Sequence, residues 1–143
     1  MFVKVCGLRT EEDVACAAAA GADAVGFGFS ESVRRVEPAV AHRLVDATPE
    51  HLLTVAVFGG VPVAEAKRIA LATGVAAVQL HGPYPRSAFD AFAGLPLRLI
   101  RATAVEPDTD LRVGAYGEEM LLLDSRTAGS GRRWDLSLLD GDR

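Results

Sequence analysis

The feature that most constrains the fold of this chain is a regular alternation of short apolar runs with longer segments of helical pattern. The apolar runs occupy residues 2–6, 22–29, 52–58, 76–80, 97–102 and 119–124. They are rich in Val, Leu and Ile, which is typical of strands buried on both faces of a parallel sheet. The predicted helices lie between them, at residues 11–20, 38–46, 63–73, 86–93 and 108–116. We therefore expect an α/β fold with six parallel strands.

The helix ends and the strand spacing support this interpretation. Thr10 can cap the first helix, and Gly21 and Gly74 follow the last turns of the first and third helices. Successive strands start at a spacing of about one β/α unit, which implies parallel strands joined by right-handed crossovers. Two architectures fit this period: an open doubly wound sheet, or part of a β/α barrel. The period alone does not separate them.

Composition excludes several classes of partner. The net charge of −4 provides no basic field that would attract nucleic acid or an anionic membrane. No run approaches the roughly 18 apolar residues that a membrane-spanning helix needs, and the N-terminus does not resemble a signal peptide. Cys6 and Cys16 have neither the spacing of metal ligands nor that of a disulfide framework. We expect a cytoplasmic protein that binds neither nucleic acid nor membrane.

Candidate site residues lie where the strands end, because parallel α/β folds bind ligands beyond the carboxyl ends of their strands. These positions carry polar side chains that we expect to face one rim: Cys6, Arg34, Arg35, Gln79, His81, Arg101 and Asp124. A thiol, an imidazole, a carboxylate and guanidinium groups on one rim would be unusual in a purely structural protein. They are the groups that an active site on one face of the fold needs.

Each candidate also has a structural interpretation. Cys6 could be a packed thiol, or a base whose thiolate is stabilised by nearby arginines. Asp124 ends an apolar strand, so it has to be hydrogen-bonded or to carry a proton, as a general acid does. Arg34 could be a solvated loop charge. The segment Gly129-Ser130-Gly131 is assigned to substrate binding because its backbone N–H groups could cradle an anion, although it could also be a mobile lid.

Several segments of the chain form an ordered set of motifs. They are VKVCGL at 3–8, GADAVGFGF at 21–29, SVRRV at 32–36, VAVF at 55–58, VQLHG at 78–82 and LLLDSRTAGSGRRWDLSLL at 121–139. In order and spacing this set resembles the phosphoribosylanthranilate isomerases of tryptophan biosynthesis, which are β/α-barrel enzymes. The resemblance covers nearly the whole chain.

The resemblance implies an Amadori rearrangement of N-(5-phosphoribosyl)anthranilate to an open-chain aminoketose. Asp124 would be the general acid that protonates the ribose ring oxygen, and Cys6 the general base that takes a proton from the neighbouring sugar carbon. Arg34 would hold the anthranilate carboxylate, while Gln79 and His81 would line the same face. Because the substrate nitrogen acts as the electron sink, neither a metal nor an organic cofactor is expected.

The chain departs from the family pattern at its end. Eight-unit barrels need about 200 residues, whereas this chain of 143 residues stops after its sixth predicted strand. We expect a single, incomplete (β/α)8 TIM-barrel domain over residues 1–143, without the last two β/α units and their phosphate-binding loops. The first and sixth strands would then lack neighbours, so a homo-oligomer is expected to cover the open edges.

These departures leave two functional expectations. The first is an isomerase whose small-molecule substrate is phosphoribosylanthranilate. The alternative is a repurposed or catalytically silent homologue that binds an anthranilate-like ligand or acts as an interaction module. Three smaller departures are Gly59-Gly60, where the family usually has an apolar residue and Asn or Asp, Pro83-Tyr84, which replaces an acidic pair, and Arg101, which takes the place of a common Lys.

Overall fold

The six apolar runs form one curved parallel sheet. The computed structural model describes residues 1–125, 127, 130–133 and 135–140. Its strands are β1 (Lys4–Cys6), β2 (Ala24–Gly28), β3 (Leu53–Gly59), β4 (Ala77–His81), β5 (Arg98–Ala104) and β6 (Met120–Asp124). They pair in the order β1-β2-β3-β4-β5-β6, and each pair is parallel. The predicted strands are confirmed.

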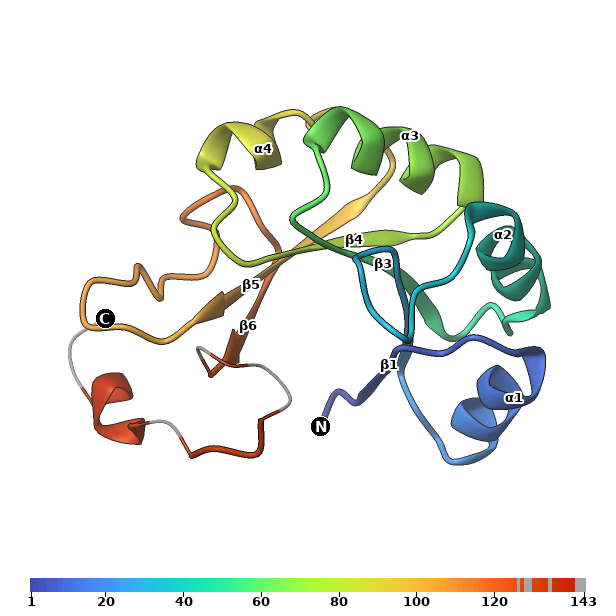
Figure 1. Ribbon diagram of the computed structural model, residues 1–143, viewed down its shortest axis with the longest axis horizontal. Helices are drawn as coiled ribbons and strands as arrows, with labels where there is room; N and C mark the ends of the chain where they lie inside the picture. Colours follow the sequence, from blue (N-terminus) through green and yellow to red (C-terminus); the bar gives the residue numbers. More distant parts are fainter. Residues whose placement is uncertain (126, 128–129, 134, 141–143) are drawn as a thin grey trace.

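The strand order separates the two architectures that the sequence left open. A doubly wound sheet reverses its strand order at a switch point, so some consecutive strands are not neighbours. Here every strand pairs with the next one along the chain, as in a β/α barrel. Figure 1 shows the resulting arc, with the α-helices on its convex side and β1 and β6 at its two ends. The fold is a TIM-barrel arrangement over six strands.

Capping residues mark the start of α1 and the end of α3. They are α1 (Glu11–Ala19), α2 (Pro38–Ala47), α3 (Val63–Thr73), α4 (Arg86–Asp90) and the short 3-10 helix η1 (Leu136–Leu139). The Thr10 hydroxyl accepts a hydrogen bond from the Asp13 N–H at 3.1 Å, which confirms the predicted cap of α1. Gly74 ends α3 in the left-handed conformation, with φ +78°. The predicted helix at 86–93 is shorter than expected, because residues 91–94 form turns.

Apolar side chains pack on both faces of the sheet. The larger cluster lies between the sheet and the helices, and its fully buried members include Phe27, Phe58 and Leu80. The inner face carries a smaller cluster: Ala24, Val55, Ala77 and Ile100. Burial on both faces explains why the strands show so little polar alternation.

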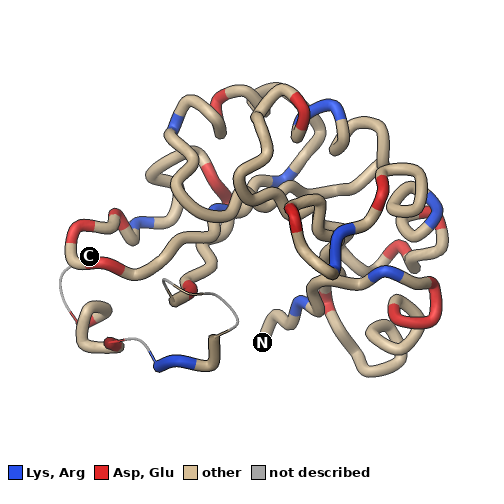
Figure 2. The backbone as a smooth tube through the Cα atoms, in the orientation of Figure 1, with Lys and Arg blue, Asp and Glu red and all other residues tan. Residues whose placement is uncertain are grey.

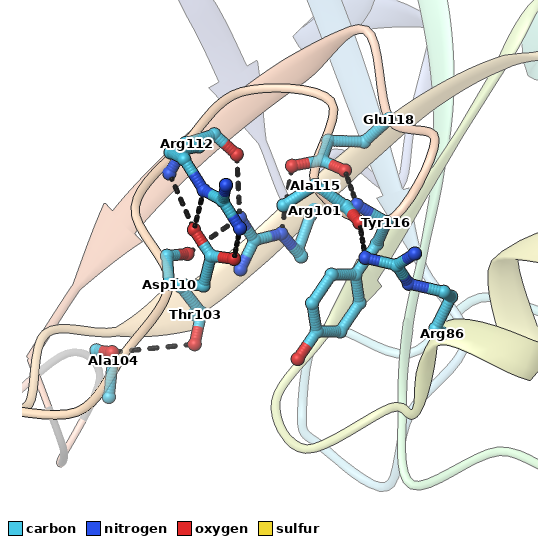
Figure 3. A network of polar contacts seen from close by, with 9 residues as sticks. All are labelled: Arg86, Arg101, Thr103, Ala104, Asp110, Arg112, Ala115, Tyr116 and Glu118. Atoms are coloured by element: carbon cyan, nitrogen blue, oxygen red, sulfur yellow. Dashed lines mark hydrogen bonds and ion pairs between the residues drawn. The ribbon is translucent and has the colours of Figure 1, made fainter. Parts of the chain in front are cut away.

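The predicted helix at 108–116 is wrong. Residues 113–116 form only a turn. The Arg101 guanidinium donates to the backbone carbonyls of Asp110, at 2.8 Å, and of Arg112, at 3.3 Å (Figure 3). A helix would need these carbonyls for its own backbone hydrogen bonds. The side chain of a neighbouring strand therefore satisfies groups that the sequence pattern assigned to a helix.

The position of Arg101 also corrects the expectation that it faces the rim with the other candidates. Arg101 pairs in register with Leu80, which belongs to the outer cluster, so its side chain lies on the helix side of the sheet. Its Nε donates to Oε1 of Glu118 at 2.9 Å, and the two side chains are 5% and 0% exposed. The guanidinium also lies 4.5 Å from the centre of the Tyr116 ring (Figure 3). Arg101 is a structural residue of the outer layer.

Charged residues of both signs are interspersed along the backbone (Figure 2). Among the residues that the structure describes, no helix is long and apolar enough to cross a membrane.

Candidate active site

Four predicted site residues lie on the inner face of the sheet. They are Cys6, Gln79, His81 and Asp124. In a parallel sheet, register partners share a face and alternate residues of a strand return to it. By this alternation each of the four shares the face of the inner apolar cluster. The structure therefore places these four residues on one face of the sheet, as expected.

The Cys6 thiol sits at the carboxyl end of β1, directly over Gly26 of β2. A Cβ atom at Gly26 would come within 2.9 Å of Sγ, closer than side chains tolerate, so only glycine leaves room for the sulfur. The turn after Cys6 is fixed by the Gly26 carbonyl, which accepts from the N–H groups of Gly7, at 3.0 Å, and Leu8, at 3.1 Å. Cys6 is exposed. It is thus an accessible thiol held in a defined place.

Arg34 reaches the same end of β1 from the loop after β2. A Cβ atom at Gly7 would lie 2.8 Å from both Cδ and Nη1 of Arg34, so the guanidinium stem covers the residue that follows Cys6. The loop is held by the Ser32 hydroxyl, which accepts from the Arg34 N–H at 3.0 Å. Arg35 instead pairs with Glu31 on the surface, at 3.3 Å. The structure therefore separates the two arginines, and only Arg34 lies against the end of β1.

Lys4 is a charged residue of the inner face that sequence reasoning missed. Its Nζ donates to Oε1 of Gln79 across the sheet and lies 3.9 Å from Sγ of Cys6. The signal that could have found it is a lone cation in an apolar run, two residues before Cys6. That spacing places both side chains on one face of a strand.

His81 lies beside a cavity at the carboxyl ends of β4, β5 and β6. The cavity has a volume of about 380 Å³, and its polar lining includes His81, Thr103, Thr109 and Ser125. Its size suits a small molecule or a part of one. The role of His81 in lining a substrate site stays a prediction.

Asp124 ends β6, the last strand of the arc. One of its carboxylate oxygens, Oδ1, accepts from the Ser125 N–H at 2.7 Å, and the residue is half-buried. We expected a carboxylate at the end of an apolar strand to be either hydrogen-bonded or protonated, and the structure shows the hydrogen bond. Since β1 and β6 are the two ends of the arc, Asp124 and Cys6 stand on strands that face each other across its open side (Figure 1).

The predicted anion cradle at 129–131 lies partly outside the described residues, because Gly129 is not among them. The Ser130 N–H donates to the Thr127 carbonyl at 3.2 Å, and the Ser130 hydroxyl accepts from the Arg132 N–H at 3.2 Å. Gly131 has φ +69°. One N–H of the proposed cradle is therefore already bonded within the loop, and the role of this segment stays a prediction.

Within the described part of the chain, no group of three or more His, Cys, Asp and Glu side chains is placed to hold a metal ion. The groups that are present are a thiol next to an ammonium, a carboxylate, an imidazole and a guanidinium. Such a set can move protons and hold an anion. Fold and site together define the class: a β/α-barrel protein with acid–base groups at the carboxyl ends of its strands.

Comparison with known proteins narrows this class to a family. Residues 3–143 match the family described as N-(5'-phosphoribosyl)anthranilate isomerase. The curated isomerase of Symbiobacterium thermophilum is 37% identical to the chain over 145 aligned residues, which cover 97% of this chain. The chain belongs to the N-(5'-phosphoribosyl)anthranilate isomerase family, as its motifs predicted.

Solved structures agree with this assignment. TrpF from Jonesia denitrificans superposes with a TM-score of 0.85 and 41% identity, covering 98% of this chain and 69% of that one. A phosphoribosyl anthranilate isomerase in complex with reduced 1-(o-carboxyphenylamino)-1-deoxyribulose 5-phosphate superposes with a TM-score of 0.80 and 32% identity, covering 97% and 68%. The chain spans 64% of the length of the Symbiobacterium relative.

Proposed function

We propose that the protein catalyses the Amadori rearrangement of N-(5'-phosphoribosyl)anthranilate to the corresponding aminoketose. The observation that carries the proposal is the placement of Cys6 and Asp124 on one face, at the carboxyl ends of the two strands that end the arc. A substrate between them would meet a base on one side and an acid on the other. Membership of the isomerase family supports the same reaction.

The proposed chemistry needs two proton transfers and no net oxidation. Asp124 gives a proton to the ribose ring oxygen, the bond between that oxygen and C1 breaks, and the nitrogen lone pair forms an iminium. Cys6 as thiolate then takes the proton from C2, and the electrons of that bond neutralise the iminium to give an enolamine. Tautomerisation yields the aminoketose. Acid and base act on different atoms, so each can hold the protonation state that its step requires.

Arg34 is the proposed partner of the anthranilate carboxylate. Its guanidinium lies over Gly7, next to the proposed base, and a planar guanidinium suits a carboxylate because it can donate two parallel hydrogen bonds. Gln79 and His81 line the same face. The ligand in the solved relative carries a carboxyphenylamino group, whose carboxylate is the kind of group that Arg34 would bind.

The test is turnover of phosphoribosylanthranilate generated in place, followed by the loss of its fluorescence. We expect turnover by the chain and a loss of at least about a hundredfold in Asp124→Asn, which keeps the shape but cannot donate the proton. Asp90→Asn, on the exposed surface of α4, is the matched control and should leave the rate unchanged. Equal rates for Asp124→Asn and the unaltered chain would refute the role of Asp124.

We also propose that the protein forms a homo-oligomer. In the described part of the chain β1 pairs with β2 and β6 pairs with β5, and each has no second neighbour. A relative of known structure, 30% identical, is described as derived from the dimeric isomerase of Thermotoga maritima. Sedimentation at micromolar concentration should give a mass above that of one chain, and a sharp monomer would contradict the proposal.

The cytoplasmic location is likewise a proposal. It is supported by the two free cysteines, since thiols are kept reduced in that compartment. Fractionation of cells that express the protein should recover it with cytoplasmic markers.

A further inference from the structure

Lys4 is the cation of β1, two residues before the proposed base, Cys6. Its Nζ lies 3.9 Å from Sγ of Cys6, within reach of a hydrogen bond to sulfur. The same Nζ donates to Oε1 of Gln79, on β4. Lys4 therefore joins a thiol on one strand to an amide on another, across the inner face of the sheet.

The surroundings of Lys4 make an unpaired charge costly. Lys4 and Gln79 line an inner-face cavity of about 270 Å³ whose other lining is mostly apolar, with Ile100, Met120 and Leu122 among its members. Burial lowers the pKa of Lys4, while the neighbouring Cys6 sulfur acts in the opposite direction and favours the ammonium form. A cation beside a thiol favours the charged thiolate form, and the Lys4 ammonium lies 3.9 Å from the Cys6 sulfur.

We propose that Lys4 is a positioning residue of the isomerase: anchored by Gln79, it holds the Cys6 sulfur in place as a thiolate. The inference rests on the proposed function for its catalytic meaning, since Cys6 acts there as the base. It assigns Gln79 a second role, in addition to lining the site. The arrangement follows from the two-residue spacing of Lys4 and Cys6, which puts both side chains on the inner face.

Other titratable groups lie against the end of β1 or share the inner face of the sheet. Arg34 covers Gly7 from the loop after β2, and His81 of β4 and Asp124 of β6 share the inner face. Gly26 of β2, which leaves room for the sulfur, carries no charge. Any shift in the titration of Cys6 must therefore be assigned by variants of Lys4 itself, with Arg34, His81 and Asp124 kept unchanged.

The first test uses the two cysteines of the chain as probe and internal reference. Alkylation by iodoacetamide is followed for each cysteine by mass spectrometry between pH 5 and 10. Lys4→Met should slow alkylation of Cys6 about tenfold at pH 7 and move its profile to higher pH, because a thiolate loses a neighbouring cation. Cys16, exposed on α1, should not change. Lys4→Arg should retain most of the effect, and Lys67→Met on α3 should have none.

A second measurement keeps the inference testable if Lys4→Met does not fold. In Cys6→Ala the contact of Lys4 with sulfur is lost, so the Lys4 amine should lose its proton more readily. Competitive labelling with acetic anhydride at pH 8 should then modify Lys4 several-fold faster than in the unaltered chain, relative to Lys67. Unchanged labelling of Lys4 in Cys6→Ala would overturn the inference, and so would unchanged alkylation of Cys6 in a folded Lys4→Met.

Neither labelling experiment requires turnover, so its outcome is separate from that of the isomerase assay. If labelling shows that Lys4 and Cys6 affect each other but the protein has no turnover, the Lys4–Cys6 pair stands and the proposed isomerase activity is refuted. A chain with turnover and no coupling would refute the role of Lys4 and leave the isomerase standing. Where turnover is present, the acid limb of the kcat profile should move to higher pH in Lys4→Met, which a merely structural lysine would not cause.

Discussion

The sulfur of Cys6 lies against Gly26, where a methyl group would come within 2.9 Å of it. The proposed base therefore depends on a residue of the neighbouring strand that has no side chain. Gly26→Ala should displace the thiol and reduce turnover by about tenfold to a hundredfold, because misplacement of a reacting group by an ångström has effects of this size. Turnover of Gly26→Ala and the unaltered chain is the measurement.

Gly28→Ala is the matched control for this substitution. Gly28 lies on the same strand, and a Cβ atom there would meet only the Arg34 carbonyl oxygen, at 3.9 Å, an ordinary contact. It should keep most of the activity. Full activity in Gly26→Ala would contradict the tight placement of Cys6.

Arg34 should govern substrate binding through the shape of its guanidinium. Arg34→Lys keeps the charge but cannot donate two parallel hydrogen bonds to a carboxylate, so KM should rise about tenfold or more. Arg35→Lys is the control, because Arg35 pairs with Glu31 on the surface and should change KM little. Equal KM values for the two variants would remove Arg34 from the proposed carboxylate site.

The buried ion pair of Arg101 and Glu118 should control stability rather than chemistry. Arg101→Met leaves the Glu118 carboxylate buried without its cation and also releases the carbonyls of Asp110 and Arg112. We expect a loss of about 3–5 kcal/mol in the free energy of unfolding, measured by urea denaturation. Arg98→Met breaks the pair with Glu119, whose side chains are 47% and 51% exposed, and should have a much smaller effect.

Glu118 should also contribute to the pH dependence of stability. Burial by itself raises the pKa of Glu118, but the backbone N–H groups of Glu118 and Tyr116 and the Arg101 guanidinium outweigh burial, so the pKa lies below its usual 4.5. A lowered pKa in the folded state adds stability above about pH 4.5, and this contribution is lost as the pH falls through the folded-state value. The measurement is the free energy of unfolding, from urea denaturation at pH values between 7 and 3. The loss of stability due to Glu118 should be absent in Glu118→Gln and present in Glu50→Gln.

The sequence predicted the sheet well because its strands are buried on both faces. Runs such as 22–29 and 52–58 therefore stand out as continuous apolar segments, and β2 and β3 lie within them. The predicted helix at 108–116 failed because its carbonyls bond to Arg101, which lies on a neighbouring strand. A contact between separate segments of the chain leaves no trace in local periodicity.

The candidate site was predictable where it follows from strand alternation. Cys6, Gln79, His81 and Asp124 share a face because register partners and alternate residues of parallel strands point to the same side of the sheet. The contact between Lys4 and Gln79 was not predictable, since it depends on how the curved sheet brings β1 and β4 together. Arg101 was assigned to the wrong face for a different reason. A polar residue near the end of a strand does not by itself reveal to which side of the sheet its side chain points.

The assignment of Cys6 as the base is tested most directly by the isomerisation rate of Cys6→Ala beside that of Cys16→Ala. Both variants remove an exposed thiol from the same chain, but only Cys6 stands on the inner face, beside Lys4 and Gly26. With phosphoribosylanthranilate generated in place, the account predicts that Cys16→Ala retains full turnover and that Cys6→Ala loses at least about a hundredfold. Equal turnover by the two variants would show that Cys6 is not the base and would contradict the central claim.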